Sequence, residues 1–485
     1  MLGRNIAKTN PKPIVVDRCR TGINNLDDAL SGGFPTRSMI LLGGGPGSGK
    51  TNFGMTFLAN GAEMFGERGL YVSFLESKGT MYAEMKQIGI DLQKLENQKK
   101  FFYEEVMSVS GAAMGGVLGK IISTITKNKI KRVVFDSITA VAQAFDQEYQ
   151  ARQVLNTVIS KVVRNLGATT LVISERLSQS PSDSHYEEFV ADGVVGLKAG
   201  PPRELEIRKM RGTRLLNRTF TCTIDKGYMV LKTVITRPVH PKAWEPIPFT
   251  EQRASTGIKD MDMALGGGAP NGLYVVFEVD SSVSTEELHL VTDGTVMNFL
   301  SQGHGVLYLP PSGSGAKDLV DHIRPYLKPD DLKILRVPEY SSPDNDTESN
   351  PIPEYVAIMK VSGSENDSGL GFFDKTLSEL KRLTNNKTVL RVISYDVLEN
   401  KYTKLFNEIG LAIATTKSTG DITIGIARPS LSILPKLIDT VDHHFKISKF
   451  NGTLTIQGIK PETPLLAFRC DISKGFPEAR LTAIA

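Results

Sequence analysis

The chain has 485 residues, of which 40% are hydrophobic and 23% charged, which is typical of a soluble globular protein with two or three domains. Its formal net charge of +4 is too small to indicate nucleic-acid binding by itself. The three cysteines, Cys19, Cys222 and Cys470, lie far apart, which argues against a disulfide scaffold or a cysteine zinc site. No signal-peptide core or membrane-spanning apolar run is found, so we expect a cytoplasmic protein that makes no membrane contact.

The first elements of the chain lead up to a glycine-rich loop. Residues 1–19 are polar and contain two prolines, and we expect a flexible arm. Residues 20–33 predict a short helix, because their apolar side chains recur at helical spacing before two glycines. An apolar run at 39–42 then predicts a buried strand, and residues 52–65 predict a helix.

Between that strand and that helix, residues 44–51 fit the phosphate-binding pattern G-x-x-x-x-G-K-[ST] in full. Its glycines let the backbone N–H groups point at phosphate oxygens, and the helix N-terminus adds partial positive charge. In this pattern Lys50 reaches the β- and γ-phosphates, and the Thr51 hydroxyl holds Mg²⁺. We therefore predict that the phosphates of a nucleotide, with Mg²⁺, bind at Gly45, Pro46, Gly47, Ser48, Gly49, Lys50, Thr51 and Asn52.

Strands and helices alternate through the rest of the first half. Strands are predicted at 70–74, 101–103, 132–136 and 168–174, and helices at 80–89, 116–127 and 150–166. This alternation predicts an α/β fold, with a mostly parallel twisted sheet flanked by helices and ligands at the carboxyl ends of the strands. Alternating patterns at 194–197, 203–210 and 219–224 predict a short antiparallel extension.

A P-loop NTPase also needs a carboxylate for Mg²⁺, a group that orients the attacking water, and positive charge on the γ-phosphate. Asp136 ends a buried strand and suits the metal role, although an aspartate there can also cap a turn. Glu76 ends another strand and is either the catalytic base or a solvated charge. Ser174 with Glu175 and Arg176 either senses the γ-phosphate or forms a surface ion pair.

The positive charge has a candidate source in Lys209 and Arg211. Alternating positions on a strand put both side chains on one face. From the residues alone, this run reads as a solvated basic edge, which would also keep the sheet from aggregating.

Together these motifs resemble the KaiC family of the RecA/RadA superfamily of P-loop ATPases. The resemblance runs in order through 21–33, 44–51, 71–76, 135–139, 167–176, 186–192 and 209–213. It implies ATP bound between adjacent subunits of a homo-oligomeric ring, usually a hexamer. Lys209 and Arg211 would then reach the γ-phosphate of a neighbouring subunit's nucleotide. Gly212 and Thr213 of the same motif would bind the same nucleotide.

One departure from the family concerns catalysis. The family usually has two adjacent glutamates after the second strand, where this chain has Leu75 and Glu76. We therefore expect slow ATP hydrolysis by Lys50, Glu76, Lys209 and Arg211. The autophosphorylation residues of the clock protein have no recognisable counterpart, so autokinase activity is not predicted.

The second half repeats the opening of the first. Residues 256–270 match residues 21–35 at nine of fifteen positions, with a constant offset of 235, and an apolar strand follows in both. The phosphate loop is replaced by 278–286, which has no glycine, three acidic residues that would repel a nucleotide, and Thr285 in the place of Lys50.

Further along the second copy, two carboxylates have predicted counterparts. Ser312 takes the place of Glu76, and a strand at 389–396 leaves Asp396 as the counterpart of Asp136. We predict tandem RecA-like domains with these bounds: 1–19 arm, 20–235 ATPase domain, 236–252 proline-rich linker, 253–485 degenerate domain without a functional P-loop.

The favoured function is a regulatory ATPase whose oligomer state depends on nucleotide, with the second domain as a scaffold or a surface for a protein partner. A RecA/RadA-like DNA-binding ATPase is an alternative, but residues 1–19 are too short for the additional DNA-binding module usual in that class. Nucleic acid is therefore possible but not favoured. A nucleotide sensor that binds proteins without hydrolysing ATP is a third possibility.

Overall fold

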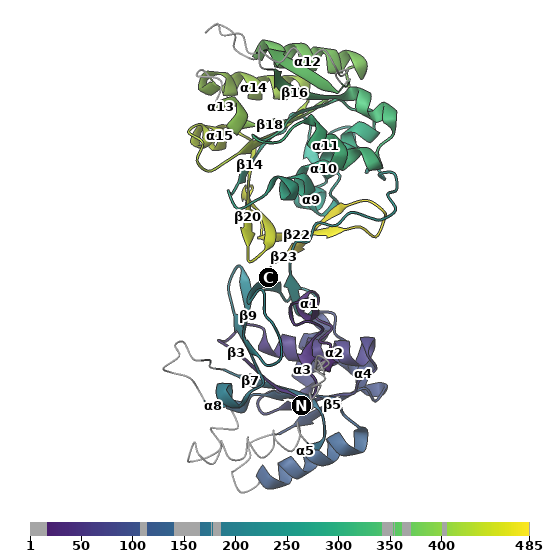
Figure 1. The fold of residues 1–485 in the computed structure, drawn as a ribbon, viewed down its shortest axis with the longest axis vertical. Helices are drawn as coiled ribbons and strands as arrows, with labels where there is room; N and C mark the ends of the chain where they lie inside the picture. The colour runs from purple at the N-terminus through teal and green to yellow at the C-terminus, as the bar shows by residue number, and fades with distance from the viewer. Residues whose placement is uncertain are drawn as a thin grey trace, which may run out of the picture. The chain divides into compact units, whose positions relative to one another are not determined.

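The computed structural model describes residues 17–106, 114–139, 165–175, 177, 186–341, 353, 355–360, 370–399 and 405–484. The described residues fall into two compact units that meet in sequence between Leu231 and Lys232. Each unit is a mixed sheet covered by helices (Figure 1). Within the described ranges no helix combines the length and apolar character needed to span a membrane.

The first unit is built on a nine-stranded sheet of order β11-β10-β9-β8-β3-β7-β6-β4-β5. Every pairing from β8 to β5 is parallel, whereas β9, β10 and β11 are added antiparallel. The strands are β3 (Met39–Gly44), β4 (Gly69–Ser73), β5 (Phe101–Glu105), β6 (Arg132–Asp136), β7 (Thr169–Ser174), β8 (Gly193–Lys198), β9 (Arg203–Met210), β10 (Thr219–Thr223) and β11 (Met229–Leu231). A separate short pair joins β1 (Arg18–Cys19) to β2 (Phe34–Pro35).

Helices cover both faces of this sheet. One face packs against α2 (Lys50–Met64), α3 (Lys78–Gln87) and α4 (Leu92–Asn97), and the other packs against α5 (Met114–Asn128). Two short helices complete the described part of the unit, α1 (Leu26–Ala29) and α8 (Tyr186–Val190). The predicted α/β fold class is confirmed, although β8, expected to be antiparallel, is parallel to β3 and antiparallel only to β9. All but the end of the helix predicted at 150–166 lies outside the described residues.

The second unit repeats this arrangement with ten strands in the order β17-β16-β15-β18-β19-β14-β20-β21-β22-β23. Pairings from β17 to β20 are parallel and those beyond β20 antiparallel. The strands are β14 (Tyr274–Val279), β15 (Val306–Leu309), β16 (Leu335–Ser341), β17 (Val356–Lys360), β18 (Leu390–Ser394), β19 (Ile422–Ala427), β20 (His443–Phe450), β21 (Thr453–Lys460), β22 (Leu466–Asp471) and β23 (Glu478–Ala483), with a separate pair β12 (Arg253–Ala254) and β13 (Ala269–Pro270).

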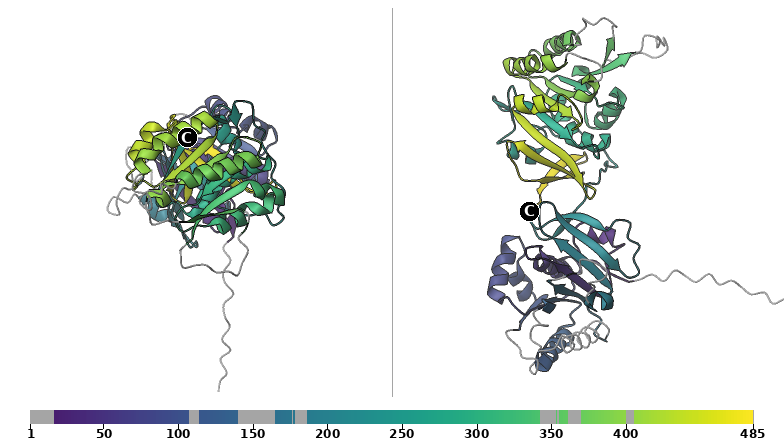
Figure 2. Two further views of the ribbon diagram at one scale, coloured as in Figure 1. Left: turned by 90° about the horizontal axis from the view of Figure 1, so that it is seen from above. Right: turned by 90° about the vertical axis from the view of Figure 1, so that its left-hand side faces the viewer.

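The helices of the second unit also lie on both faces of its sheet, as the two further views in Figure 2 show. They are α9 (Lys259–Ala264), α10 (Thr285–Ser301), α11 (Ala316–Ile323), α12 (Leu370–Leu383), α13 (Tyr395–Glu399), α14 (Leu405–Thr419) and α15 (Leu434–Thr440), with 3-10 turns η3 (Arg324–Tyr326) and η4 (Pro329–Ile334). Strand β14 therefore takes the place of β3, and α10 takes the place of α2.

The duplication extends to individual hydrogen bonds at the start of each unit. Asp27 accepts from Thr21 N and Thr21 Oγ1, both at 2.7 Å. Asp262 accepts from Thr256 N at 2.8 Å and Thr256 Oγ1 at 2.6 Å. The two units thus share a local structure as well as a strand order.

The proline-rich segment 236–252 contains no helix or strand and packs on the second unit. Trp244 is only 7% exposed and belongs to that unit's core. Its backbone N–H donates to Tyr326 O at 2.8 Å, and Lys242 N donates to Gly475 O at the same distance. This segment is therefore an ordered part of the second unit's structure.

Candidate functional site

The phosphate-binding loop joins the carboxyl end of β3 to the start of α2. Gly47 and Gly49 have φ angles of 69° and 89°, which other residues rarely adopt, so these two glycines set the curl of the loop. The first helical hydrogen bond of α2 runs from Phe53 N to Gly49 O at 2.9 Å. The amides of residues 50–52 therefore precede the helical ladder and point out of the helix N-terminus, where an anion is favoured.

Two side chains of the loop, Lys50 and Ser48, could take phosphate as a partner. Lys50 Nζ donates to Gly44 O and Gly45 O, both at 2.9 Å. Burial lowers the pKa of Lys50, against the opposing charges of Asp136 and Glu175. Ser48 is buried, and among the described residues its Oγ has no hydrogen-bond partner. A bound anion would give the ammonium a charged partner in place of neutral carbonyls.

The predicted metal ligands are brought together by the sheet. Thr51 Oγ1 donates to Asp136 Oδ2 at 2.9 Å, and Tyr71 OH donates to the same oxygen. Burial raises the pKa of Asp136, while the two hydrogen bonds and the Lys50 charge oppose the rise. A hydroxyl and a carboxylate at the phosphate loop are the oxygen ligands that suit Mg²⁺.

Glu76 lies three residues beyond the end of β4, and its backbone is held in place. Ser73 Oγ donates to Glu76 O at 2.9 Å and accepts from Glu76 N at 3.0 Å, while Tyr103 OH donates to Glu76 O at 2.9 Å. The side chain itself is exposed. Partial desolvation, followed by the charges of Glu84 and Asp136, raises the pKa of its carboxyl.

The carboxyl end of β7 also reaches this edge of the sheet. Ser174 pairs with Gly43 at the end of β3, and Glu175 N donates to Thr139 Oγ1 at 3.1 Å. The Glu175 charge opposes the lowering of the Lys50 pKa that burial causes. Arg176, proposed with them as a γ-phosphate sensor, lies outside the described residues.

Lys209 and Arg211 do not approach the phosphate loop of their own chain. In β8, Leu197 pairs with Gly44 beside the loop, whereas Gly193 pairs with Ile40 at the other end of β3. Because β9 runs antiparallel to β8, its carboxyl end lies beside Gly193. The two cations are therefore at the opposite end of the sheet from the loop.

At that end, the cations have contacts of their own. Arg211 Nη1 lies 2.9 Å from Asp192 Oδ1 and its side chain is 58% exposed. Lys209 Nζ donates to the carbonyls of residues 188 and 189 at 3.1 and 3.2 Å. Gly212 O and Thr213 Oγ1 accept from the Arg18 guanidinium at 2.6 and 2.7 Å.

The first residue of β9 is a loop contact that the sequence analysis missed. Arg203 Nη1 donates to Gly47 O at 2.6 Å. The signal that could have identified it is the antiparallel direction of this strand, which places its start at the edge opposite to Lys209. Arg203 thus adds a cation on the phosphate loop from within the same chain.

In the second unit, the loop before α10 uses its amides internally. Thr285 begins α10 as Lys50 begins α2. Ser282 N donates to Asp280 Oδ1 at 2.8 Å, Val283 N to Asp280 O at 3.1 Å, and Ser284 N to Glu287 Oε2 at 2.9 Å. These N–H groups are therefore not directed at a ligand.

Two of the acidic residues of this loop have partners of their own. Glu278 lies 2.9 Å from His444 Nε2 and 3.6 Å from Lys446 Nζ. Two hydrogen bonds from Ser282 lower the pKa of Asp280. Asp280 therefore stays negatively charged and would still repel phosphate, and the occupied amides are a second difference from the first unit.

The prediction that Asp396 is the counterpart of Asp136 is wrong. Strand β18 pairs with β15 from its first residue, as β6 pairs with β4, so the place of Asp136 is taken by Ser394. Asp396 lies two residues further on, in α13, and accepts from Ser312 N at 3.1 Å. The strand was correctly matched but its end was misplaced, because alternation alone does not give the register between strands.

Comparison with known proteins gives one match to the first unit and others of differing extent. Residues 19–233 match a family model described as "ATPase: KaiC". The circadian clock oscillator protein KaiC of Prochlorococcus marinus is 34% identical over 268 residues, 52% of this chain and 51% of the relative. Protein GvpD2 of Halobacterium salinarum is 25% identical over 470 residues, 91% of this chain and 92% of the relative.

A solved structure of a KaiC-like protein from Pyrococcus horikoshii is 32% identical and matches 44% of this chain and 99% of its own, with a TM-score of 0.40. The match to the Prochlorococcus protein spans about half of that relative's length. The family model, which matches residues 19–233, covers the unit that carries the phosphate loop.

Proposed function

The first unit belongs to the KaiC-like ATPase family of the RecA superfamily, and on that premise we propose that it binds Mg-ATP between copies of this chain and hydrolyses it slowly. The observation that carries the proposal is the separation of Lys209 and Arg211 from the phosphate loop of their own chain. A neighbouring copy can supply these cations to the loop, as arginine fingers do in trans. A site complete only in an assembly would link nucleotide to oligomer state.

The residues of the loop fit this nucleotide. Lys50 and the N-terminal amides of α2 would bind the phosphates, and Arg203 would hold the loop from β9. Thr51 and Asp136 would hold Mg²⁺, which when bound offsets negative charge on the phosphate oxygens. The buried Ser48 hydroxyl, unpaired among the described residues, would gain a partner.

Glu76 would orient and deprotonate the attacking water. Its backbone is held by Ser73 and Tyr103, so the exposed carboxylate projects from a positioned main chain. Leu75, which is 69% exposed, occupies the place where the family usually has a second glutamate. A single carboxylate supports general-base catalysis with less charge at the site, in keeping with slow turnover.

The second unit would bind no nucleotide and would act as a scaffold or as a surface for a protein partner. The backbone N–H groups of its loop, which a phosphate would need, already donate to residues of the same segment. It also has Thr285 at the position of the lysine. Nucleotide bound to the first unit would then control the assembly of the whole chain into rings, which are usually hexamers in this family.

The direct test is the mass of the full chain by light scattering, with and without Mg-ATP. We expect a larger assembly with nucleotide for the wild type and for Arg214→Ala, a matched change of an exposed neighbouring arginine. We expect Arg211→Ala to remain small. Equal assembly of wild type and Arg211→Ala would contradict the shared site, whereas assembly without ATP turnover would favour the non-hydrolysing sensor.

Mixing two inactive variants tests whether the site is shared. Lys50→Ala lacks the loop lysine and Arg211→Ala lacks the neighbour's cation, so each alone should show little turnover. In a random equal mixture, about a quarter of the interfaces would combine an intact loop with an intact Arg211. Turnover should therefore reappear on mixing. A mixture as inactive as its components would mean that both residues act within one chain.

A further inference from the structure

The second unit contains a cavity of about 390 Å³ between its sheet and helices α12, α13 and α14. Voids in protein interiors rarely exceed the size of a water molecule, and this volume lies in the range of about 300–1,000 Å³ usual for small-molecule sites. Most of the wall is apolar, including Leu307, Phe373, Leu377, Ile393, Leu398 and Ile409. We propose that this cavity binds a small anionic amphiphile, an apolar chain that ends in one carboxylate.

The polar recognition group is Arg391, which extends from β18 to the cavity wall and is 7% exposed. Its Nη2 donates to Asp421 Oδ2 at 2.8 Å, and its Nη1 donates to Thr416 Oγ1 at 3.4 Å. Its Nε is buried and has no hydrogen-bond partner in the described part of the chain. The unpaired Nε leaves the guanidinium charge incompletely compensated, which favours an anion in the cavity that Arg391 lines.

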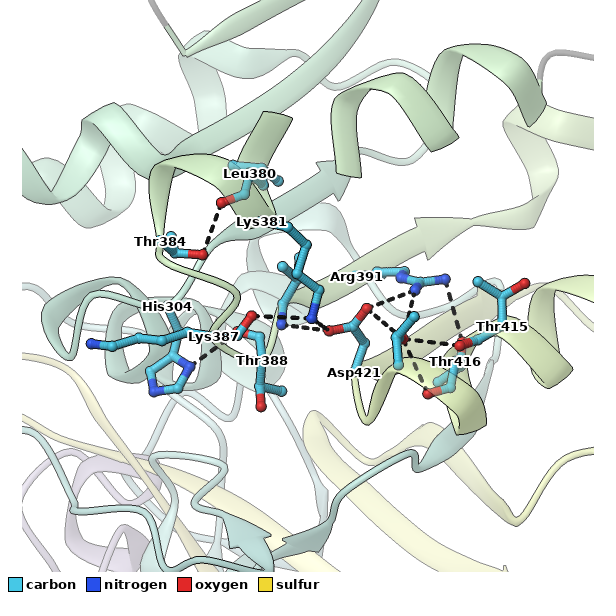
Figure 3. A network of polar contacts seen from close by, with 12 residues as sticks. His304, Leu380, Lys381, Thr384, Lys387, Thr388, Arg391, Thr415, Thr416 and Asp421 are labelled. Atoms are coloured by element: carbon cyan, nitrogen blue, oxygen red, sulfur yellow. Dashed lines mark hydrogen bonds and ion pairs between the residues drawn. The ribbon is translucent and has the colours of Figure 1, made fainter. Parts of the chain in front are cut away.

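The charges around Arg391 favour an anion. Asp421, which is 1% exposed, lies between two cations, with Lys381 Nζ 2.5 Å from Oδ1 and Arg391 Nη2 2.8 Å from Oδ2 (Figure 3). Two positive charges share one carboxylate in this network, which leaves an excess of one positive charge. A carboxylate head group would balance it, whereas an ammonium head group would add to it.

A second donor lies in the same wall. The hydroxyl groups of Tyr274 and Tyr395 are hydrogen bonded to each other, and both tyrosines line the cavity. Two hydroxyls carry two protons, and their mutual bond uses only one of them. Burial raises the pKa of both tyrosines, so the second proton stays in place and can be donated to a ligand oxygen.

The first unit has no such groups on the corresponding strand positions. Arg391 and Tyr274 both pair with Thr423. Their counterparts, Val133 and Met39, both pair with Thr170 and belong to an apolar core cluster. The polar groups are therefore particular to the second unit, and the inference does not depend on nucleotide binding by the first.

The open side of the cavity gives the orientation of the ligand. Leu411 and Asp374 both line the cavity and are exposed, Leu411 to 63%. An anionic head would be repelled by Asp374 and attracted to Arg391 inside. The apolar chain would then lie along the leucine and isoleucine wall and reach toward Leu411.

Calorimetric titration of the full chain with decanoate, below its micelle concentration, tests the proposal without any mutation. Decanol and decyltrimethylammonium have the same chain with a neutral or cationic head. We expect decanoate to bind, and the other two to bind at least about tenfold more weakly. No binding of decanoate, or equal binding of all three, would overturn the proposal.

Two alanines of α14 provide matched variants. Ala412 lines the cavity, whereas Ala414 is exposed on the same helix and is not part of the wall. Ala412→Phe should fill the cavity and abolish decanoate binding, and Ala414→Phe should bind as the wild type does. Lys50→Ala should also bind decanoate normally. Undiminished binding by a folded Ala412→Phe, checked by circular dichroism, would place the ligand elsewhere.

Discussion

The Thr51 hydroxyl donates a hydrogen bond of 2.9 Å to the Asp136 carboxylate, which joins the start of α2 to the end of β6. The ionised Asp136 carboxylate lowers the stability of the folded protein, because burial raises the pKa of the carboxyl even with hydrogen bonds from Thr51 and Tyr71. A group that destabilises the free protein but suits a cation is a common compromise at functional sites.

Asp136→Asn should raise the thermal stability of the nucleotide-free protein at neutral pH and remove Mg²⁺-dependent ATP binding. With its pKa raised in the folded state, the carboxyl contributes most to stability when protonated, and that contribution is lost as pH rises through the folded pKa. Melting temperatures by calorimetry should therefore differ by a few degrees at neutral pH and converge in acid. A less stable Asp136→Asn at neutral pH would contradict this account.

Lys50→Ala should weaken ATP binding by on the order of 100-fold, because a charge-assisted contact to phosphate is lost. Thr285→Ala, the matched change at the first position of α10, should have no effect. Binding of a fluorescent ATP analogue measures both. Comparable losses in the two variants would mean that the second unit also holds nucleotide.

Thr285→Lys should not create a second nucleotide site. The lysine would restore a charge, but the amides of residues 282–284 would remain bonded to Asp280 and Glu287. The number of analogue molecules bound per chain, measured at saturation, should stay at one. A second equivalent of bound nucleotide would show that the missing lysine, rather than the occupied amides, closes this loop.

Glu76→Gln should abolish ATP turnover and leave ATP binding within about twofold of the wild type, because it removes a base without touching the phosphate loop. Since the pKa of Glu76 is raised, the wild-type rate should fall on the acid side at a higher pH than an ordinary glutamate would give. Measuring the turnover rate as a function of pH tests the direction of this shift. If Glu76→Gln kept the wild-type turnover and the same fall in rate at acid pH, another residue would be the base.

Arg203→Ala should weaken ATP binding about tenfold, because it removes the guanidinium that holds Gly47 O at 2.6 Å. Its effect should appear in a single chain, unlike that of Arg211→Ala, which depends on assembly. Binding of the ATP analogue, measured at protein concentrations too low and high enough for assembly, separates the effects of Arg203→Ala and Arg211→Ala. Concentration-dependent loss in Arg203→Ala would contradict its place in the same chain.

The sequence alone determined the features that depend on neighbours along the chain. The pattern at residues 44–51, an apolar strand before it and a helix after it specify a phosphate loop, because local spacing sets backbone conformation. Alternating strands and helices likewise indicated the fold class, and Asp136 and Glu76 were placed at the correct edge because parallel strands end together.

Only the tertiary structure decided which residues share a site. The antiparallel direction of β9 puts Arg203 on the phosphate loop and Lys209 and Arg211 at the far end of the sheet. The register of β18 puts Ser394, and not Asp396, in the place of Asp136. The partner of each strand and the register between them are set by contacts between residues distant in the chain, and a local pattern of residue types does not encode those contacts.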